Sequence, residues 1–269
     1  MTEIQLILAF LFLGSVVGFV AGLLGVGGGG GGIMVPVLTV IFLQQGIHID
    51  NVMHLALGTS MASIIVTSLS SLRAHQKHNA INWEIVKLMS VGVIAGTFFA
   101  TFLASQLSSL YLAVFFSVFM CYMAFKMLFK KQDNTLVNSI NISNLLLSST
   151  GIGAISALVS IGGGSLTVPY LTSKNIDIKK AIGTSAAIGL PISIAGTLGY
   201  LINGWNNDFD YNNSLGFIYL PAVFLISITS FITAPFGAKL AQHLPVHILK
   251  KIFAFLLISL SMKMLISLI

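Results

Sequence analysis

Charged residues are scarce in this chain of 269 residues. Asp, Glu, Lys and Arg together make up only 7% of it, whereas a soluble domain carries roughly 25%. Hydrophobic residues make up 56%, and the mean hydropathy is +0.97. Because so few charges cannot cover a water-exposed surface, the composition excludes a soluble domain and predicts a chain embedded in lipid.

The chain also lacks the residue sets that enzymes and metal sites need. Its one cysteine, Cys121, cannot form an internal disulfide. The six histidines lie in predicted loops without metal-ligand spacing, and no nucleophile has a base beside it. Gly25 to Gly30 fits the dinucleotide pattern G-x-G-x-x-G, but the strand that this motif requires is missing. We therefore expect no metal, no cofactor and no enzymatic activity.

Long apolar runs are what the sequence has in abundance. They are about as long as the ~20 residues that cross a bilayer, or longer, and cover 4–43, 52–72, 88–125, 140–171, 181–202, 215–238 and 252–269. The N-terminus lacks a basic region, so we expect no cleavable signal peptide. The predicted fold class is an all-α polytopic membrane protein with about eight hydrophobic helical segments. The net charge of +6 is assigned to cytoplasmic loops, not to nucleic-acid binding.

The sequence contains three motifs twice, in the same order, which indicates an internal duplication. The pairs are "GVGGGGGGIMVP" (25–36) with "SIGGGSLTVP" (160–169), "ALGTSMA" (56–62) with "AIGTSAA" (181–187), and "MAFKMLF" (123–129) with "LSMKMLI" (260–266). We therefore predict two transmembrane repeats, residues 1–133 and 134–269. Each would start with a glycine-broken helix or hairpin, followed by three transmembrane helices.

The distribution of Lys and Arg predicts how the repeats are oriented. These residues cluster in 73–87, 126–131, 174–180 and 239–251, and are absent from 44–54, 105–109 and 203–214. If each glycine segment is a hairpin that enters and leaves on one side, all basic loops fall in the cytoplasm and both termini outside. Each half then makes three crossings besides its hairpin, so the repeats are inverted. Eight plain spans with an imperfect charge bias are the alternative.

The duplicated glycine runs predict a binding site for an anion. A half-helix that starts after such a run presents free N–H groups and a positive dipole end, and glycine lets a ligand approach the backbone. The hydroxyls that follow each run can donate hydrogen bonds without adding charge. The predicted substrate-binding residues are Gly27, Gly28, Gly29, Gly32, Thr59, Ser60, Gly162, Gly163, Gly164, Ser165, Thr184 and Ser185, and the predicted hinges are Pro36 and Pro169.

Each of these residues also has a structural interpretation. Glycines in membrane helices permit close helix packing, and Ser and Thr hydroxyls cap helices or bond to the preceding turn. The duplication favours a binding role over these alternatives.

In this order, the motifs "GVGGGGGGIMVP", "ALGTSMA", "HNAINW", "SIGGGSLTVP" and "AIGTSAA" resemble those of the sulfite exporter TauE/SafE family, also called the TSUP permeases. The resemblance covers nearly the whole chain. It implies a bacterial inner membrane and small, mostly sulfur-containing anions such as sulfite and sulfonates. The chain departs from the pattern once, because Val26 to Pro36 is ten residues and Ile161 to Pro169 is eight.

The residues and the resemblance together predict a secondary carrier for a small oxyanion, either sulfite or an organosulfonate such as sulfoacetate. It would work by alternating access in the bacterial cytoplasmic membrane, with the anion and membrane lipid as partners and no nucleic acid. A coupling proton or ion is left open. The alternatives are a passive small-anion channel and a non-transporting membrane scaffold or sensor.

Overall fold

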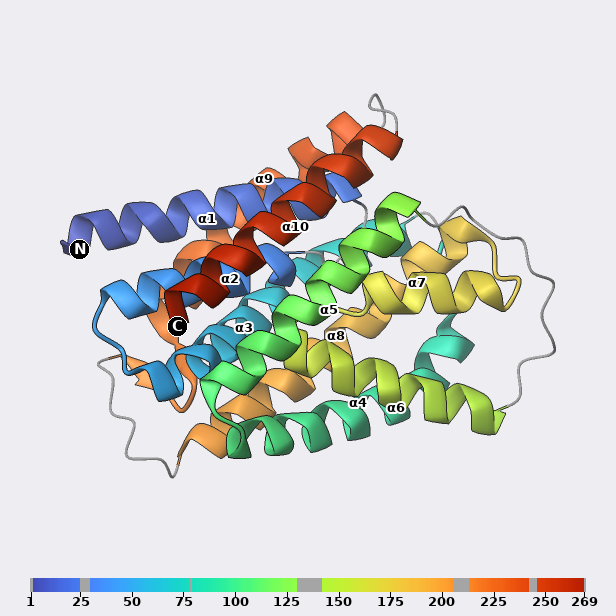
Figure 1. The fold of residues 1–269 in the computed structure, drawn as a ribbon. Coiled ribbons are helices and arrows are strands. Elements are labelled where there is room, and N and C mark those ends of the chain that lie inside the picture. The colour runs from blue at the N-terminus through green and yellow to red at the C-terminus, as the bar shows by residue number, and fades with distance from the viewer. Residues whose placement is uncertain are drawn as a thin grey trace.

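A computed structural model gives the fold (Figure 1) and describes residues 2–24, 30–77, 79–129, 142–205, 213–241 and 246–268. These residues form ten α-helices and one two-stranded hairpin. The helices are α1 (Glu3–Leu24), α2 (Gly31–Gln44), α3 (Ile49–Gln76), α4 (Trp83–Gln106), α5 (Ser109–Phe129), α6 (Ile142–Val159), α7 (Gly164–Ser173), α8 (Ile178–Trp205), α9 (Leu220–Ala241) and α10 (Val246–Leu268); the strands are β1 (Ser214–Leu215) and β2 (Ile218–Tyr219).

Six of these helices, α1, α3, α4, α5, α8 and α9, are long and apolar enough to cross a membrane. Large apolar side chains such as Phe12, Phe99 and Phe224 are more than 60% exposed, as expected where lipid is the solvent. The prediction of an all-α polytopic membrane protein is confirmed. The eight predicted segments become ten helices because each glycine run separates two helices.

The two helices that carry the G-T-S motifs, α3 and α8, form the centre of the molecule. The apolar span of α3 is 83% buried and that of α8 is 61% buried, against 28% for α1 and for α9. α3 and α8 pack against each other along their lengths. A residue in either motif is therefore surrounded by protein rather than by lipid.

The outer helices pack in corresponding pairs. α1 lies along α9, and α6 lies along α4. In the order of elements, α1 and α6 each precede a glycine run, and α4 and α9 are the fourth helices of their halves. The first helix of each half therefore packs against the fourth helix of the other, so the two halves cannot be separate bodies.

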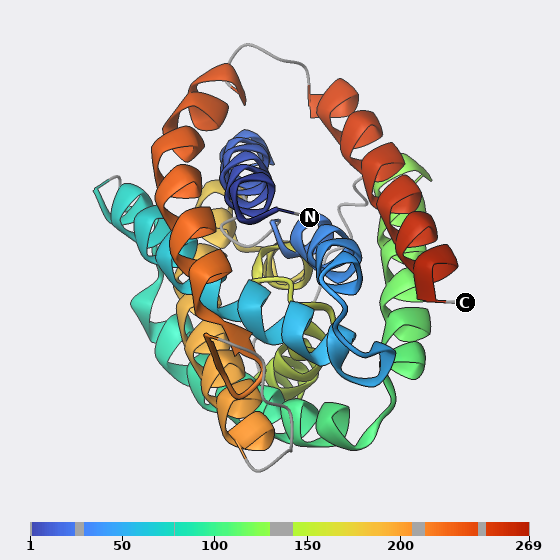
Figure 2. The same cartoon turned by 90° about the vertical axis from the view of Figure 1, so that its left-hand side faces the viewer.

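Both chain termini lie toward the same end of the molecule, called the termini end below (Figures 1 and 2). α1 runs away from this end and α2 returns to it, whereas α6 and α7 enter and leave from the opposite end (Figure 1). α5, α7 and α9 also finish at the opposite end (Figure 1), and Lys126, Lys174 and Lys239 lie at or just after the C-termini of these helices.

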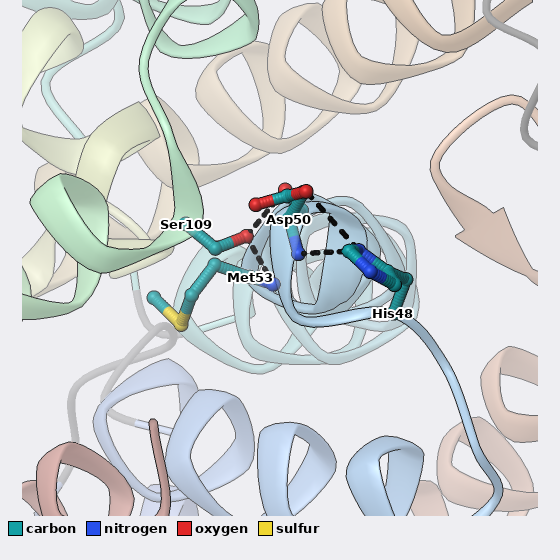
Figure 3. A network of polar contacts seen from close by, with 4 residues as sticks. All are labelled: His48, Asp50, Met53 and Ser109. Carbon is teal, nitrogen blue, oxygen red and sulfur yellow. Dashed lines mark hydrogen bonds and ion pairs between the residues drawn. The ribbon is translucent and has the colours of Figure 1, made fainter. Parts of the chain in front are cut away.

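A small polar network joins α3 to α5 (Figure 3). The buried Ser109 hydroxyl donates to the Asp50 backbone carbonyl at 2.7 Å and accepts the Met53 N–H at 3.2 Å. His48 Nδ1 lies 3.1 Å from the Asp50 carboxylate and caps the first turn of α3 by accepting the Asp50 N–H. One hydroxyl therefore fixes the start of α5 against the start of α3.

Candidate binding site at the glycine breaks

Both short helices, α2 and α7, begin beside the middle residues of the longer helices that pack against them. A Cβ atom on Gly32 would lie 2.7 Å from Leu257 and 3.4 Å from Met120, which are near the middles of α10 and α5. A Cβ atom on Gly163 would lie 3.3 Å from Ile192, in the middle of α8. The ends of two half-helices therefore lie deep inside the protein, where bulk water cannot satisfy them.

The two breaks share one capping hydrogen bond and one proline position, although the runs contain different numbers of glycines. Gly30 caps α2 and accepts the Met34 N–H at 2.8 Å; Gly163 caps α7 and accepts the Thr167 N–H at 2.7 Å. In both helices a proline follows the first helical residue by five positions. The two extra glycines of the first run therefore precede Gly30.

This register changes which glycines correspond. Gly30 and Gly31 of the first break are equivalent to Gly163 and Gly164 of the second. Sequence reasoning missed Gly30 and Gly31, because six identical residues in a row can be aligned with the second run in several ways. The candidates Gly27, Gly28 and Gly29 lie outside the described residues.

The equivalent positions after the caps differ in polarity. The second break has Ser165 and Thr167 where the first has Gly32 and Met34. Thr167 is fully buried, and its hydroxyl has no hydrogen-bond partner among the described residues. A Cβ atom on Gly163 would lie 3.3 Å from this hydroxyl oxygen, so the hydroxyl points to the start of α7. Sequence reasoning missed Thr167, although its alignment with Met34 would have revealed the contrast.

The backbone at the second break offers free donors. The N–H groups of Gly163, Ser165 and Leu166 make no hydrogen bond to any described residue. They lie in the first turn of α7, where the helix dipole is positive. Gly162 and Gly164 are buried beside them, and Ser165 is half-buried. A small group with several acceptor oxygens is the chemical complement of such a cluster.

Helix α8 forms the wall facing the second break. A Cβ atom on Gly163 would lie 3.4 Å from the Ser185 carbonyl oxygen. A Cβ atom on Gly189 would lie 3.2 Å from the Ser68 hydroxyl of α3 and 3.9 Å from the Gly163 nitrogen. Because Gly189 has no side chain, nothing at this position of α8 fills the space between the buried Ser68 hydroxyl and the second break.

The first break is filled by packing instead. A Cβ atom on Gly31 would overlap the Ser160 carbonyl oxygen, which belongs to the turn before the second break. Ser160 has a positive φ of 48°, and its hydroxyl donates to the Leu57 carbonyl at 3.2 Å. The two breaks thus meet, and an acceptor oxygen lies against the start of α2. Gly32, a predicted binding residue, packs against Leu257 of α10.

The four predicted hydroxyl donors of the two G-T-S motifs have different surroundings. The Thr59 oxygen accepts the Tyr219 N–H at 2.9 Å, and the Thr184 oxygen accepts the Asn82 N–H at 3.0 Å. The Ser185 hydroxyl donates to the Ile182 carbonyl of its own helix at 2.9 Å. Ser60 is fully buried, and its hydroxyl finds no partner in the described part of the chain.

The two predicted hinges lie inside helices, at equivalent positions. Pro36 is the sixth residue of α2, and Pro169 is the sixth of α7. A proline removes one hydrogen bond from its helix and favours a bend there. Their hinge role stays a prediction.

Three histidines differ from the expected position, because His54 and His75 lie in α3 and His247 lies in α10. His54 is buried in α3, its Nε2 atom lies 2.9 Å from the Ala104 carbonyl oxygen, and its ring lies 5.0 Å from the Phe217 ring in a tilted arrangement. Within the described ranges, no three His, Cys, Asp or Glu side chains come together as a metal site would need.

Comparison with known proteins agrees with the fold and the motifs. The sequence model of the sulfite exporter TauE/SafE family matches residues 10–264. A "Probable membrane transporter protein" of Haemophilus influenzae is 36% identical over 261 residues, covering 96% of this chain and 97% of the relative. A probable membrane transporter protein of Methanocaldococcus jannaschii is 27% identical, with 91% of both chains covered. No solved structure gives a significant match. The chain is an integral membrane transporter, and it belongs to the sulfite exporter TauE/SafE family.

Proposed function

We propose that the protein is a secondary carrier for a small oxyanion and binds it at the start of α7. One observation carries this proposal: free backbone N–H groups and the unpartnered, fully buried Thr167 hydroxyl lie together at a helix N-terminus deep inside the protein. Buried donors without acceptors are costly, and an anion supplies the missing acceptors.

The donor set favours an oxyanion over other ligands. All of these donors are neutral. They can hydrogen-bond an anion without a fixed positive charge, which would bind the anion too tightly for release. None of the residues nearest to Gly163 and Gly189 is a Lys or an Arg. A tetrahedral or pyramidal oxyanion presents several acceptor oxygens, each of which can take one of these converging N–H groups. Within this class, the family description points to sulfite, and by resemblance to sulfonates such as sulfoacetate.

The proposed mechanism is alternating access between two inverted repeats, residues 1–133 and 134–269. Support comes from the opposite directions in which the two hairpins enter the molecule and from the corresponding pairs α1–α9 and α4–α6. The basic helix ends would face the cytoplasm of a bacterium, and both termini would lie outside. Pro36 and Pro169 would bend α2 and α7 during the exchange.

Counterflow in proteoliposomes tests the substrate. Vesicles are loaded with unlabelled sulfite, labelled sulfite is added outside in trace amount, and the assay is repeated with sulfoacetate and acetate. We expect transient accumulation of a sulfur anion but not of acetate. A non-saturable flux would instead favour a channel, and no flux of any anion from folded protein would contradict the proposal.

The binding site is tested by Gly163→Ala. The added Cβ would lie 3.3 Å from the Thr167 hydroxyl and from Ile192, inside the space that the anion needs. We expect counterflow to fall at least tenfold while the protein still inserts and purifies as a single species. Gly151→Ala is the matched control, because a Cβ on Gly151 of α6 meets nothing within 4 Å. Equal flux in Gly163→Ala and Gly151→Ala would exclude the second break as the site.

A further inference from the structure

The first G-T-S motif contacts the segment between α8 and α9. The Thr59 hydroxyl oxygen accepts the Tyr219 N–H at 2.9 Å. A Cβ atom on Gly58 would overlap the Phe217 carbonyl oxygen, so only glycine lets this segment approach α3. Residues Gly58 and Thr59 with Phe217 and Tyr219 are called the first latch below.

The second G-T-S motif makes the same contacts with the segment between α3 and α4. The Thr184 hydroxyl oxygen accepts the Asn82 N–H at 3.0 Å. A Cβ atom on Gly183 would overlap the Ala80 carbonyl oxygen. Residues Gly183 and Thr184 with Ala80 and Asn82 are called the second latch below.

The two latches match atom for atom. In each, the glycine meets a carbonyl oxygen, and the next residue, a threonine, accepts an N–H two residues after that carbonyl. In each, the motif is on the third helix of one half and the held segment lies between the third and fourth helices of the other half. Helix packing alone does not require that a threonine hydroxyl and a backbone N–H pair in the same way at both motifs.

The latches lie at opposite ends of the molecule. The first holds a segment next to the start of α9, which is at the termini end, and the second holds a segment next to the start of α4, at the opposite end (Figure 1). The start of α7, with its free donors, lies at mid-depth between them.

We propose that the two G-T-S motifs are reciprocal latches that hold the two ends of the transport pathway closed. Each latch is a contact between the halves, so it forms when they approach at that end and breaks when they separate. The inference rests on the alternating access of the proposed carrier but not on the identity of its substrate. Thr59 and Thr184 are then positioning residues rather than anion ligands.

The described conformation has one latch closed more tightly than the other. Phe217, Ile218 and Tyr219 are all buried. The Phe217 ring lies 5.0 Å from the His54 ring, and the Tyr219 ring lies 5.8 Å from Phe42 of α2 and 5.9 Å from Phe10 of α1.

In the second latch, by contrast, Ala80 and Asn82 are half-buried, and neither carries an aromatic ring. The termini end is therefore the more firmly closed of the two in this conformation.

Cysteine labelling tests the latches without any transport assay. A Ser165→Cys reporter at the start of α7, in a Cys121→Ala background, is labelled from either face of oriented vesicles with a membrane-impermeant maleimide. Thr59→Val keeps the shape of the side chain but removes the oxygen acceptor. We expect it to raise labelling from the termini face about fivefold, the worth of one hydrogen bond, and to lower labelling from the opposite face. Thr184→Val should do the reverse.

Matched controls separate latching from general loosening. Thr67→Val in α3 and Thr197→Val in α8 remove hydroxyls that bond only to their own helix, to Ile64 and Ser193, and should leave both labelling rates unchanged. Thr59→Ser and Thr184→Ser keep the acceptor and should label as the parent does.

Where valine prevents folding, alanine removes the same acceptor. Changes of the same sign on the same face for both motifs, or no change beyond the controls, would overturn the proposal. If the two valine variants change labelling in opposite directions but no anion counterflow is seen, the latch proposal stands and only the proposed substrate is rejected.

Discussion

At the residue scale, Thr167 and Met34 are the difference between the two breaks on which the proposed one-sided site depends. They occupy equivalent positions one turn into α7 and α2, and their N–H groups make equivalent bonds to Gly163 and Gly30. Only the second copy places a hydroxyl there. The two breaks also differ in the backbone, because the Ile33 N–H bonds to Gly30 whereas the equivalent Leu166 N–H makes no hydrogen bond to any described residue.

Replacing Thr167 by valine tests that role. The change removes one hydrogen bond to a charged ligand, worth about 1.5–3 kcal/mol, so we expect the anion concentration for half-maximal counterflow to rise at least tenfold. Thr167→Ser should keep most of the affinity. Thr172→Val is the control in the same helix, because that hydroxyl bonds only to the Val168 and Pro169 carbonyls. Unchanged half-saturation in Thr167→Val would remove this residue from the site.

At the element scale, the short helices depend on their neighbours. α2 has 14 residues and α7 has 10, about 21 and 15 Å of helix, so neither can cross a bilayer. Each is placed by packing against the central helices, α2 on α3 and α7 on α8. A break in the chain at mid-depth is tolerated because protein surrounds it.

The joint between α3 and α5 should carry measurable stability. Ser109→Ala leaves the Met53 N–H and the Asp50 carbonyl without this partner, which costs about 1–3 kcal/mol when the groups are buried. We expect a lower midpoint temperature of unfolding in detergent micelles. Ser105→Ala in α4, whose hydroxyl bonds only to the Phe102 carbonyl, should leave the midpoint unchanged. Equal midpoints for the two variants would mean that the network in Figure 3 does not fix α5.

At the scale of the whole molecule, charge and hairpin direction together predict the orientation. Described Lys and Arg side chains lie at helix ends away from the termini, with Lys263 of α10 as an exception. From the positive-inside rule we predict that the termini end faces away from the cytoplasm.

Single-cysteine accessibility in whole cells checks this orientation. In a Cys121→Ala background, Gln106→Cys at the end of α4 should react with an impermeant maleimide added outside, and Lys77→Cys after α3 should react only after the cells are permeabilised. Both positions are exposed. Labelling of Lys77→Cys in intact cells would invert the proposed topology.

Much of this protein follows from its sequence. The shortage of charge forces a membrane fold, the repeated motifs identify the family, and glycine runs followed by prolines mark helix breaks. These properties are local, because solvent preference and backbone conformation act residue by residue.

Only the tertiary structure decided what each repeated residue contacts. The register of the first glycine run came from the matching caps at Gly30 and Gly163, since identical glycines cannot be told apart along the chain. The partners of Thr59 and Thr184 are backbone groups 160 and 102 residues away in the sequence. No local pattern encodes such a distant bond, because the packing of the two halves brings its donor and acceptor together.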